Sequence, residues 1–285
     1  MSLLGSLSQN KYVGKLVSGF VSNKVNREVE TIAEHFNHFL ESRIANTAEE
    51  EKEVFKIRHS VYCEELKFEE TNPDKMETDR YDKYSIFGLI KHRPSDLFTG
   101  CVRVVAPQQE NELLPIEEYC SLSYKDSDIK PTDFKRSEIS EISRLAVLSR
   151  FRRRKTDTHE GAATGAINTA TYSTEELRCF PFISVGLYLT AASITIENGS
   201  DHVFVMMEPR LARSMALIGI KFKQLGEPVE YHGLRAPYYI NGNIFIENLS
   251  PGFKSLHRAI CESIKPQLNP MKKRRQEALD NLNFR

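Results

Sequence analysis

The chain has 285 residues, of which 40% are hydrophobic and 27% are charged, an ordinary balance for one large globular domain or two smaller ones. Lysine plus arginine and aspartate plus glutamate number 39 each, so bulk charge gives no reason to expect a nucleic-acid partner, and any electrostatic recognition must be local. The five cysteines are scattered and never form a CxxC pair, which argues against a disulfide framework or a zinc site and favours a cytoplasmic location.

The first 24 residues place five apolar side chains at helical spacing among lysines, which predicts a short amphipathic helix. Such a helix can make a peripheral membrane contact, pack on the body of the protein or be disordered, and the sequence leaves these outcomes open. No basic start is followed by a long apolar core and a cleavage site, so we expect no secretory signal. The longest nearly uncharged run, residues 180–195, is too short to span a bilayer and indicates a buried helix.

A capping-box pattern, Thr47 followed by Glu50, predicts a helix that runs to about Glu65. Arg58 falls beside or within the apolar face of this helix. An arginine in that position either buries its stem and extends its charge to solvent, or faces a ligand.

The acidic loop that follows carries Glu77, Asp79 and Asp82 within six residues. Three carboxylates at this spacing could hold an amine or a cationic substrate, bind a metal ion, or be solvated without a ligand. The glycine and the closing glutamate of an EF-hand are missing, so we expect no metal site of that kind.

The remaining elements predict a mixed α/β fold around one sheet. Residues 85–91 and 99–106 read as a β-hairpin, and residues 138–148 as a third strand. The predicted elements that follow are a helix over 181–198, a strand over 202–208, a helix over 209–219, and late strands over 228–233 and 243–247. We divide the chain into an N-terminal helical segment (1–46), a central domain (47–250) and a C-terminal helix with a basic tail (251–285).

The strands contain charges that a buried sheet does not need. Arg103 interrupts the apolar run "GCVRVVA", and Glu141, Ser143 and Arg144 lie in "EISRLAV". In a regular strand Glu141 and Arg144 point to opposite faces, so they share a face only if a bulge intervenes. A buried Glu141 most simply pairs with an arginine such as Arg58, Arg103 or Arg144. The alternative is that the cluster orients a substrate or accepts a proton.

A run of cations comes directly after this strand: Arg150, Arg152, Arg153, Arg154 and Lys155. A solvated basic loop is the plainest interpretation. Nucleic-acid binding is not expected, because aromatic side chains are not interleaved with the cations beyond Phe151. An acidic carrier protein that bears a phosphopantetheine arm would suit both the charge and a phosphate site at this position.

Four motifs in this order resemble those of the acyl-homoserine-lactone synthases: "VFKIRHSVYCEELKF", "ETDRYD", "GCVRVV" and "EISRLAV". The later stretch "MEPRLARSMALIGIKFKQLGEPVEYHGLRAPYYI" resembles long-chain N-acyl amino acid synthases and the acyltransferases associated with the exosortase protein-sorting system. The resemblance covers roughly residues 50–245.

This resemblance implies an α/β fold of the GCN5-related N-acetyltransferase (GNAT) type, in which a mixed central sheet is flanked by helices. In that fold the strand that matches residues 141–148 splays from its neighbour and receives a pantetheine thioester. The positions that match the family's functional residues are Arg58, Phe68, Glu77, Asp79, Asp82, Arg103, Glu141, Ser143 and Arg144. For the reaction we expect Glu141 to act as a base or to orient a water molecule, and the backbone N–H groups of Leu145, Ala146 and Val147 to hold the thioester oxygen. We expect Arg144 and Arg103 to hold either the acidic cluster or the carboxylate of the acceptor, and the acidic loop over residues 77–82 to shape the acceptor pocket.

Two departures from the family patterns indicate which donor and which acceptor to expect. The segment "RFRRRK" has no glycine, whereas acetyl-CoA acetyltransferases cradle pyrophosphate with a glycine-rich loop, so we expect an acyl carrier protein as the donor. Phe68 stands where lactone synthases usually have tryptophan, which argues against S-adenosylmethionine as the acceptor.

We therefore expect an enzyme that makes N-acyl amino acids, with the acyl-phosphopantetheine of the carrier protein as its donor and with no other cofactor or metal. The helix over residues 182–196 would line the acyl channel. The alternatives are a lactone synthase that uses S-adenosylmethionine and a catalytically silent module that binds a lipidated carrier protein or a membrane.

Overall fold

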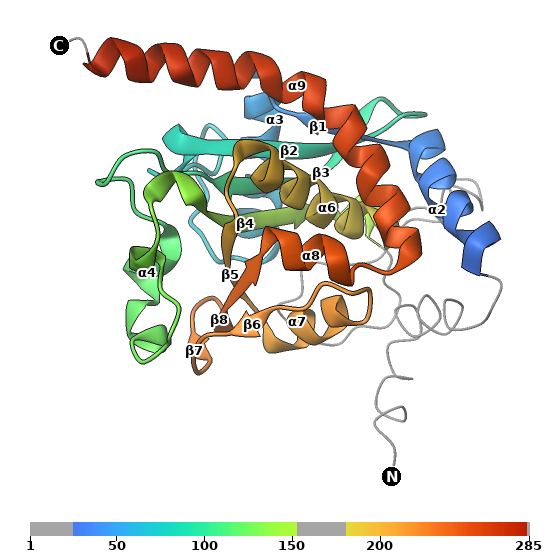
Figure 1. Ribbon diagram of the computed structural model, residues 1–285. Helices are drawn as coiled ribbons and strands as arrows, with labels where there is room; N and C mark the ends of the chain where they lie inside the picture. The colour runs from blue at the N-terminus through green and yellow to red at the C-terminus, as the bar shows by residue number, and fades with distance from the viewer. Residues whose placement is uncertain (1–24, 153–180, 284–285) are drawn as a thin grey trace.

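A mixed β-sheet organises the chain in the computed structural model, which describes residues 25–152 and 181–283 (Figure 1). The strands lie in the order β1-β2-β3-β4-β5-β8-β6, with β7 paired to β8. Neighbours are antiparallel except β4 and β5, which are parallel. The strands are β1 Leu40–Ile44, β2 Ser85–His92, β3 Leu97–Val105, β4 Ile139–Val147, β5 His202–Met207, β6 Lys223–Gln224, β7 Val229–Glu230 and β8 Leu234–Asn241.

Helices cover both faces of the sheet (Figure 1). The α-helices are α2 Val25–Phe39, α3 Ala48–Arg58, α4 Pro115–Tyr119, α6 Pro181–Asn198, α7 Pro209–Ala216, α8 Gly242–Asn248 and α9 Pro251–Asn283. A π-helical segment, His59–Glu65, continues α3. Short 3-10 turns occupy Asp82–Tyr84, Ser121–Tyr124, Pro131–Asp133, Arg136–Glu138 and Ser149–Phe151. The α/β class and the mixed sheet agree with the prediction.

Most of the predicted elements are present close to their expected bounds. The capping box is formed, since Thr47 Oγ1 accepts from Glu50 N at 3.2 Å and Glu50 Oε2 accepts from Thr47 N at 3.2 Å. The prediction of a strand at residues 243–247 is wrong, because these residues belong to α8. The Asn241 side chain caps that helix by accepting from Asn243 N at 3.0 Å.

The sheet also contains strands that the sequence did not predict: β1, β6 and β8. Because β1 pairs with β2 from Leu40 to Ile44, the sheet begins before the predicted domain boundary at residue 47. Helix α9 occupies most of the predicted C-terminal segment. The division of the chain into three segments stays a prediction.

Side-chain alternation divides the sheet into an apolar face and a site face. On β3, Val102 and Val104 join the main core, where α6 and α9 pack against the sheet. Cys101 and Arg103 point to the opposite face, where α3 and its π-helical continuation lie. The buried α6, expected from its uncharged run, fills the apolar side.

Strands β4 and β5 separate partway along their length. They pair only from Ile139 to Ile142 on β4 and from His202 to Val205 on β5, although β4 continues to Val147 and β5 to Met207. The expected splay is therefore present, and it opens directly beyond Ile142.

A β-bulge lies at the start of this opening. Cys101 is opposite Ala146 and Arg103 is opposite Ser143, so β4 holds one residue more than β3 between these pairs. Arg144 takes the left-handed conformation at φ 50°. That conformation costs an arginine about 1–2 kcal/mol unless its side-chain contacts compensate.

No helix in the described ranges combines the length and the hydrophobicity that a membrane span requires. The amphipathic helix predicted over residues 1–24 lies outside the described residues, so its membrane contact stays a prediction, as does the cytoplasmic location.

Candidate active site

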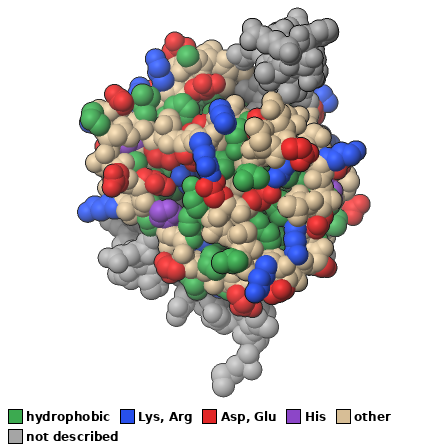
Figure 2. Space-filling model, turned by 90° about the vertical axis from the view of Figure 1, so that its left-hand side faces the viewer, with side chains coloured by type: hydrophobic (Ala, Val, Ile, Leu, Met, Phe, Trp, Pro, Cys, Tyr) green, Lys and Arg blue, Asp and Glu red, His purple; other side chains and the backbone are tan. Residues whose placement is uncertain are grey.

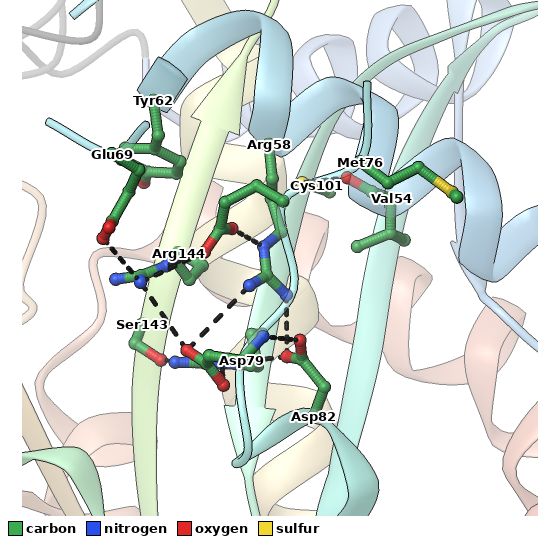
Figure 3. Close-up of polar contacts among 12 residues, drawn as sticks. Val54, Arg58, Tyr62, Glu69, Met76, Asp79, Asp82, Cys101, Ser143 and Arg144 are labelled. Atoms are coloured by element: carbon green, nitrogen blue, oxygen red, sulfur yellow. Dashed lines mark hydrogen bonds and ion pairs between the residues drawn. The ribbon is translucent and has the colours of Figure 1, made fainter. Parts of the chain in front are cut away.

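Three arginines and three carboxylates from four parts of the chain meet on the site face of the sheet (Figure 3). Arg58 ends α3, Arg103 lies on β3 and Arg144 on β4. The carboxylates come from the loop that leads into β2: Glu77, Asp79 and Asp82. The sequence predicted this set, and the structure brings all six side chains together.

Arg58 lies at the centre of the cluster with 0% of its surface exposed. Its Nε donates to Glu77, and its Nη1 donates to Asp82 Oδ1 at 2.7 Å. Its Nη2 is 4.0 Å from Asp79 Oδ2. The guanidinium therefore does not reach solvent, and its charge is balanced inside the protein, as a buried ion requires.

Arg103 joins the acidic loop to β4. Its Nη1 donates to Asp79 Oδ1 at 2.6 Å and to Asp82 Oδ1 at 2.8 Å, while its Nε donates to Ser143 Oγ at 3.0 Å. Ser143 therefore serves as a hydrogen-bond acceptor that fixes the arginine from the β4 side.

The bulge directs Arg144 into the same cluster. Its Nε donates to Glu77 Oε1 at 3.2 Å and its Nη2 to Glu69 Oε1 at 3.0 Å. The guanidinium lies over the Tyr62 ring, 5.5 Å from the centroid, and the Tyr62 hydroxyl donates to Leu145 O at 2.7 Å. These contacts hold the left-handed residue in place, and the bulge, which the sequence left open, lets Glu141 and Arg144 share a face.

The arginines keep the carboxylates ionised. Burial acts to raise the pKa of Glu77, but Arg58 and Arg144 outweigh it and hold that pKa below its usual range. Burial likewise acts to raise the pKa of Asp79, and Arg103, Arg144 and Arg58 lower it overall. In the parts of the chain that the structure describes, no group of three side chains could hold a metal ion.

A cavity of about 50 Å³ lies at the open end of the β4–β5 splay. The predicted site residues that line it are Phe68, Arg103, Glu141, Ser143 and Arg144. Arg58, Glu77, Asp79 and Asp82 do not line it; they hold Arg103 and Arg144 from behind. Positioning is therefore the role that their contacts support, and a part for them in binding the substrate stays a prediction.

Glu141 does not form the ion pair that the sequence suggested. Its carboxylate is 2% exposed, and its Oε2 accepts from Ile116 N, at the start of α4, at 2.7 Å. No arginine of the described chain lies within 4.0 Å of it. Burial raises the pKa of Glu141 to about 8, with the Ile116 hydrogen bond and the charge of Arg103 acting in the opposite direction. Near neutral pH this carboxyl group can therefore take up or release a proton.

Most of the remaining cavity wall was missed by the sequence analysis. It is made by Tyr62, Glu69, Pro115, Ile116, Tyr119, Cys120, Met206, Tyr231, His232 and Arg235. Rings dominate it: Phe68 stacks on His232 with centroids 5.1 Å apart, and Tyr119 stacks on Tyr231 at 5.6 Å. The sequence "EYHGLR" could have indicated part of this wall, since it places an aromatic residue, a histidine and an arginine around a turn.

The backbone predicted to hold the thioester lies beside the cavity. Ala146 and Val147 are buried and pair with Cys101 and Gly100 of β3. Leu145, Ala146 and Val147 place no atoms in the cavity wall. The oxygen-holding role of their N–H groups stays a prediction.

The predicted docking cations differ in exposure. Arg150 is exposed and lies over the Phe151 ring, 5.2 Å from its centroid. Arg152 departs from the expectation, because its side chain is 4% exposed and pairs with Glu65, so a carrier protein cannot reach it in this conformation. Arg153, Arg154 and Lys155 lie outside the described residues.

The face on which α4 and β7 lie shows both signs of charge around hydrophobic side chains near its centre (Figure 2). Tyr119 of the cavity wall is exposed, and Leu113 and Leu234 are exposed as well. The view gives no sign of a continuous basic surface there, in keeping with the balanced composition.

Comparison with known proteins supports the fold. Residues 57–160 match the family described as Acetyltransferase (GNAT) domain. The chain is similar to the structure of BjaI, a CoA-dependent acyl-homoserine lactone synthase, with MTA (TM-score 0.53, 16% identity, 78% of this chain and 89% of that one). It is also similar to TofI in a ternary complex with an inhibitor and MTA (TM-score 0.51, 14% identity, 75% of this chain and 99% of that one).

A further similar structure is FeeM, an N-acyl amino acid synthase from uncultured soil microbes (TM-score 0.48, 11% identity, 74% of this chain and 94% of that one). No curated protein sequence matches the chain. The fold is thus of the GNAT type, and one structural neighbour, BjaI, is a synthase of the first kind that the motifs resemble. None of these proteins is described as associated with an exosortase, and that part of the resemblance stays a prediction.

Proposed function

We propose that this chain, an acyltransferase of the GNAT type, moves a long acyl group from the phosphopantetheine thioester of an acyl carrier protein to the amine of an amino acid. The observation that carries the proposal is Glu141, a buried carboxyl group with a pKa of about 8 in a cavity at the open end of the β4–β5 splay. A group of this kind suits general base catalysis near neutral pH.

The reaction removes two protons from the ammonium nitrogen. The amine attacks the thioester carbonyl carbon only when its nitrogen lone pair is available, so the ammonium proton passes to Glu141, directly or through a water molecule. The C–N bond forms, the C–S bond breaks, and the second nitrogen proton passes to the leaving sulfur, which becomes the pantetheine thiol. The proton held by Glu141 then passes to solvent. The products are an N-acyl amino acid and the thiol form of the carrier.

The splay supplies a place for the thioester. Leu148 N donates to Thr99 O of β3 at 2.9 Å, so the alternation along a strand turns the Val147 N–H toward the β5 side, where β5 no longer pairs. We propose that this N–H holds the thioester oxygen as negative charge develops. Two of the charged groups around the cavity, Arg103 and Arg144, are fixed by carboxylates and keep its shape.

The size of the cavity supports a small acceptor. On the same measure a single water molecule needs roughly 10–15 Å³, so about 50 Å³ accommodates a group of a few heavy atoms. A small amino acid suits this space better than S-adenosylmethionine. This chain shares its fold with BjaI and TofI. A lactone synthase is therefore the second candidate function.

Local charge supports the choice of an acyl carrier protein as the donor. The segment after β4 has no glycine to cradle a pyrophosphate, and Arg150 is exposed there. An acidic carrier protein would meet this cation in a salt-dependent way. BjaI is described as CoA-dependent, so the donor must be tested on this chain directly.

The test is mass spectrometry of the products formed with long-chain acyl carrier protein, the twenty amino acids and S-adenosylmethionine together, repeated with acyl-CoA. An N-acyl amino acid formed faster from the carrier thioester supports the proposal and names the acceptor. A homoserine lactone would favour the second candidate. Retention of the acylated carrier without any product would point to a silent binding module.

A further inference from the structure

We propose that Arg235 binds the carboxylate of the acyl acceptor and so selects amino acids over simple amines. This inference rests on the function proposed above and assigns a specificity residue to the same cavity. Arg235 was not among the predicted site residues.

The other cations in the cavity wall already have carboxylate partners. Arg103 pairs with Asp79 and Asp82, at 2.6 and 2.8 Å. Arg144 pairs with Glu69 and Glu77, at 3.0 and 3.2 Å. His232 Nε2 lies 3.7 Å from Glu69 Oε1. Each of these groups already has a carboxylate beside it.

Arg235 lacks such a partner among the described residues, where no carboxylate lies within 4.0 Å of its guanidinium. Its Nε is buried and makes no hydrogen bond. The side chain lies in the cavity wall and is only partly exposed, so an acid bound in the cavity would meet a cation that is incompletely solvated. A guanidinium binds a carboxylate through two parallel N–H donors, a geometry that an amide cannot match.

The position of Arg235 on β8 turns its side chain toward the cavity. On β8, Ala236, Tyr238 and Ile240 point into the main core, so alternation turns Arg235 to the site face. Its guanidinium carbon lies 5.9 Å from the centroid of the Phe68 ring, which stacks on His232. The aromatic contacts restrict the side chain without neutralising its charge.

Arg235 also lies near the proposed base, Glu141. Cys120 lines the cavity, and both charges act on its thiol: burial first and Glu141 second raise the pKa of Cys120, and Arg235 lowers it. Glu141 and Arg235 therefore lie near the same part of the wall. An amino acid whose carboxylate meets Arg235 would direct its amine toward Glu141, and a simple amine would lack the first contact.

A binding experiment tests this assignment without requiring turnover. The probes are N-octanoylglycine, which carries a carboxylate, and N-octanoylglycinamide, which carries an amide in its place. Calorimetry compares them on the wild type, Arg235→Gln, Arg235→Lys and the control Arg93→Gln. Arg93 is 48% exposed and pairs with Glu41 away from the cavity.

We expect the wild type and Arg93→Gln to bind the carboxylate roughly 10 to 100 times more tightly than the amide, the range of a charge-assisted hydrogen-bonded pair. Arg235→Gln should bind the two probes equally, and Arg235→Lys should keep part of the preference. A full preference in Arg235→Gln, or no preference in the wild type, overturns the proposal.

Turnover then separates this inference from the proposed function. A carboxylate preference that depends on Arg235, in a protein that forms no N-acyl amino acid, would reject the proposed function and keep the binding role. Amino acid acylation whose KM for the acceptor is unchanged in Arg235→Gln would keep the function and reject the binding role.

Discussion

The Glu141 carboxyl group accepts one hydrogen bond, from Ile116 N, and has no ion-pair partner among the residues described. Because burial raises its pKa to about 8, the basic form increases as pH rises through that value. We expect kcat/KM to rise with pH up to about 8 and then level.

Glu141→Gln should lower kcat roughly 10² to 10⁴-fold and remove the step near pH 8 from the profile. The fold should survive, because the glutamine oxygen can still accept from Ile116 N. The titration of the acceptor amine is common to both enzymes and serves as the internal control. A profile that keeps the step in the variant would reject Glu141 as the base.

The same substitution should change how stability depends on pH. The unfolded Glu141 loses its proton near 4.5 and the folded one near 8, so ionisation favours unfolding progressively between these values. The loss approaches about 1.4 kcal/mol per pH unit at its steepest. Urea unfolding of wild type and Glu141→Gln from pH 5 to 9 should show the variant gaining relative stability up to about pH 8. A constant difference would contradict the assignment of the raised pKa to Glu141.

Arg58 should matter for stability rather than for binding. Arg58→Met leaves Glu77 and Asp82 buried with less compensation and should cost roughly 3–5 kcal/mol in the free energy of unfolding. Adding Glu77→Gln should cost less than the sum of the two single changes, because the removed charges are partners. Urea midpoints measure both effects, and a single-variant loss below about 1 kcal/mol would show that the cluster tolerates a missing cation.

Sequence reasoning found the charged residues of the site but not their individual roles. The E-x-S-R pattern and the acidic loop marked the residues that meet at β3 and β4. Arg235 and His232 were missed because a hairpin some 90 residues after Glu141 along the chain brings them to the cavity, and only tertiary structure shows that proximity. The expected arginine partner of Glu141 was wrong because the carboxylates of the acidic loop already occupy the available guanidinium groups.

Among the secondary-structure elements, β8 and α8 show why local patterns failed near the C-terminus. Pro237 interrupts the apolar run of β8, and proline usually argues against an interior strand. Here β6 covers only Tyr238 and Tyr239, and Pro237 O accepts from Leu225 N at 2.9 Å. In residues 243–247 the β-branched side chains favour a strand, but the Asn241 cap and the turn at Gly242 start a helix.

The pairing of β3 with β4 requires a glycine at position 100. A Cβ there would lie 2.5 Å from Ala146 O, a backbone atom that cannot move independently of the strand. Gly100→Ala should cost roughly 1–3 kcal/mol in stability and disturb the nearby bulge. In the control Gly242→Ala the nearest atom to the new Cβ is 3.8 Å away, and no loss is expected. Thermal melts compare the two, and equal behaviour would show that the strands shift apart without cost.

In the whole molecule the sheet separates the apolar core from the candidate chemistry. Helices α6 and α9 fill one face, and no α6 residue lines the cavity on the other. The expectation that residues 182–196 line an acyl channel stays a prediction. The sequence could predict α6 as buried, but the face it covers depends on the position of α9, which periodicity does not give.

Because the core and the cavity lie on opposite faces, we expect a substitution in the core to lower stability without changing catalysis. Leu256 of α9 is fully buried in the main core, so Leu256→Ala should cost roughly 2–5 kcal/mol. In the cold, where the variant remains folded, kcat and KM should match those of the wild type. Steady-state kinetics at 10 °C beside urea unfolding would check this. A raised KM at full folding would show that the two faces of the sheet are coupled.

The number of residues in the π-helical segment His59–Glu65 sets the direction in which Tyr62 points. Leu66 N donates to Val61 O, five residues earlier, at 2.9 Å, so this stretch winds with more residues per turn than an α-helix. Removing one residue before Tyr62 would let the stretch relax to an ordinary α-helix and rotate Tyr62 by about 100°. Its hydroxyl would then no longer reach Leu145 O at the bulge. A related protein one residue shorter here could keep its helix intact and still lose this support, so the length of the segment is as tightly constrained as its composition.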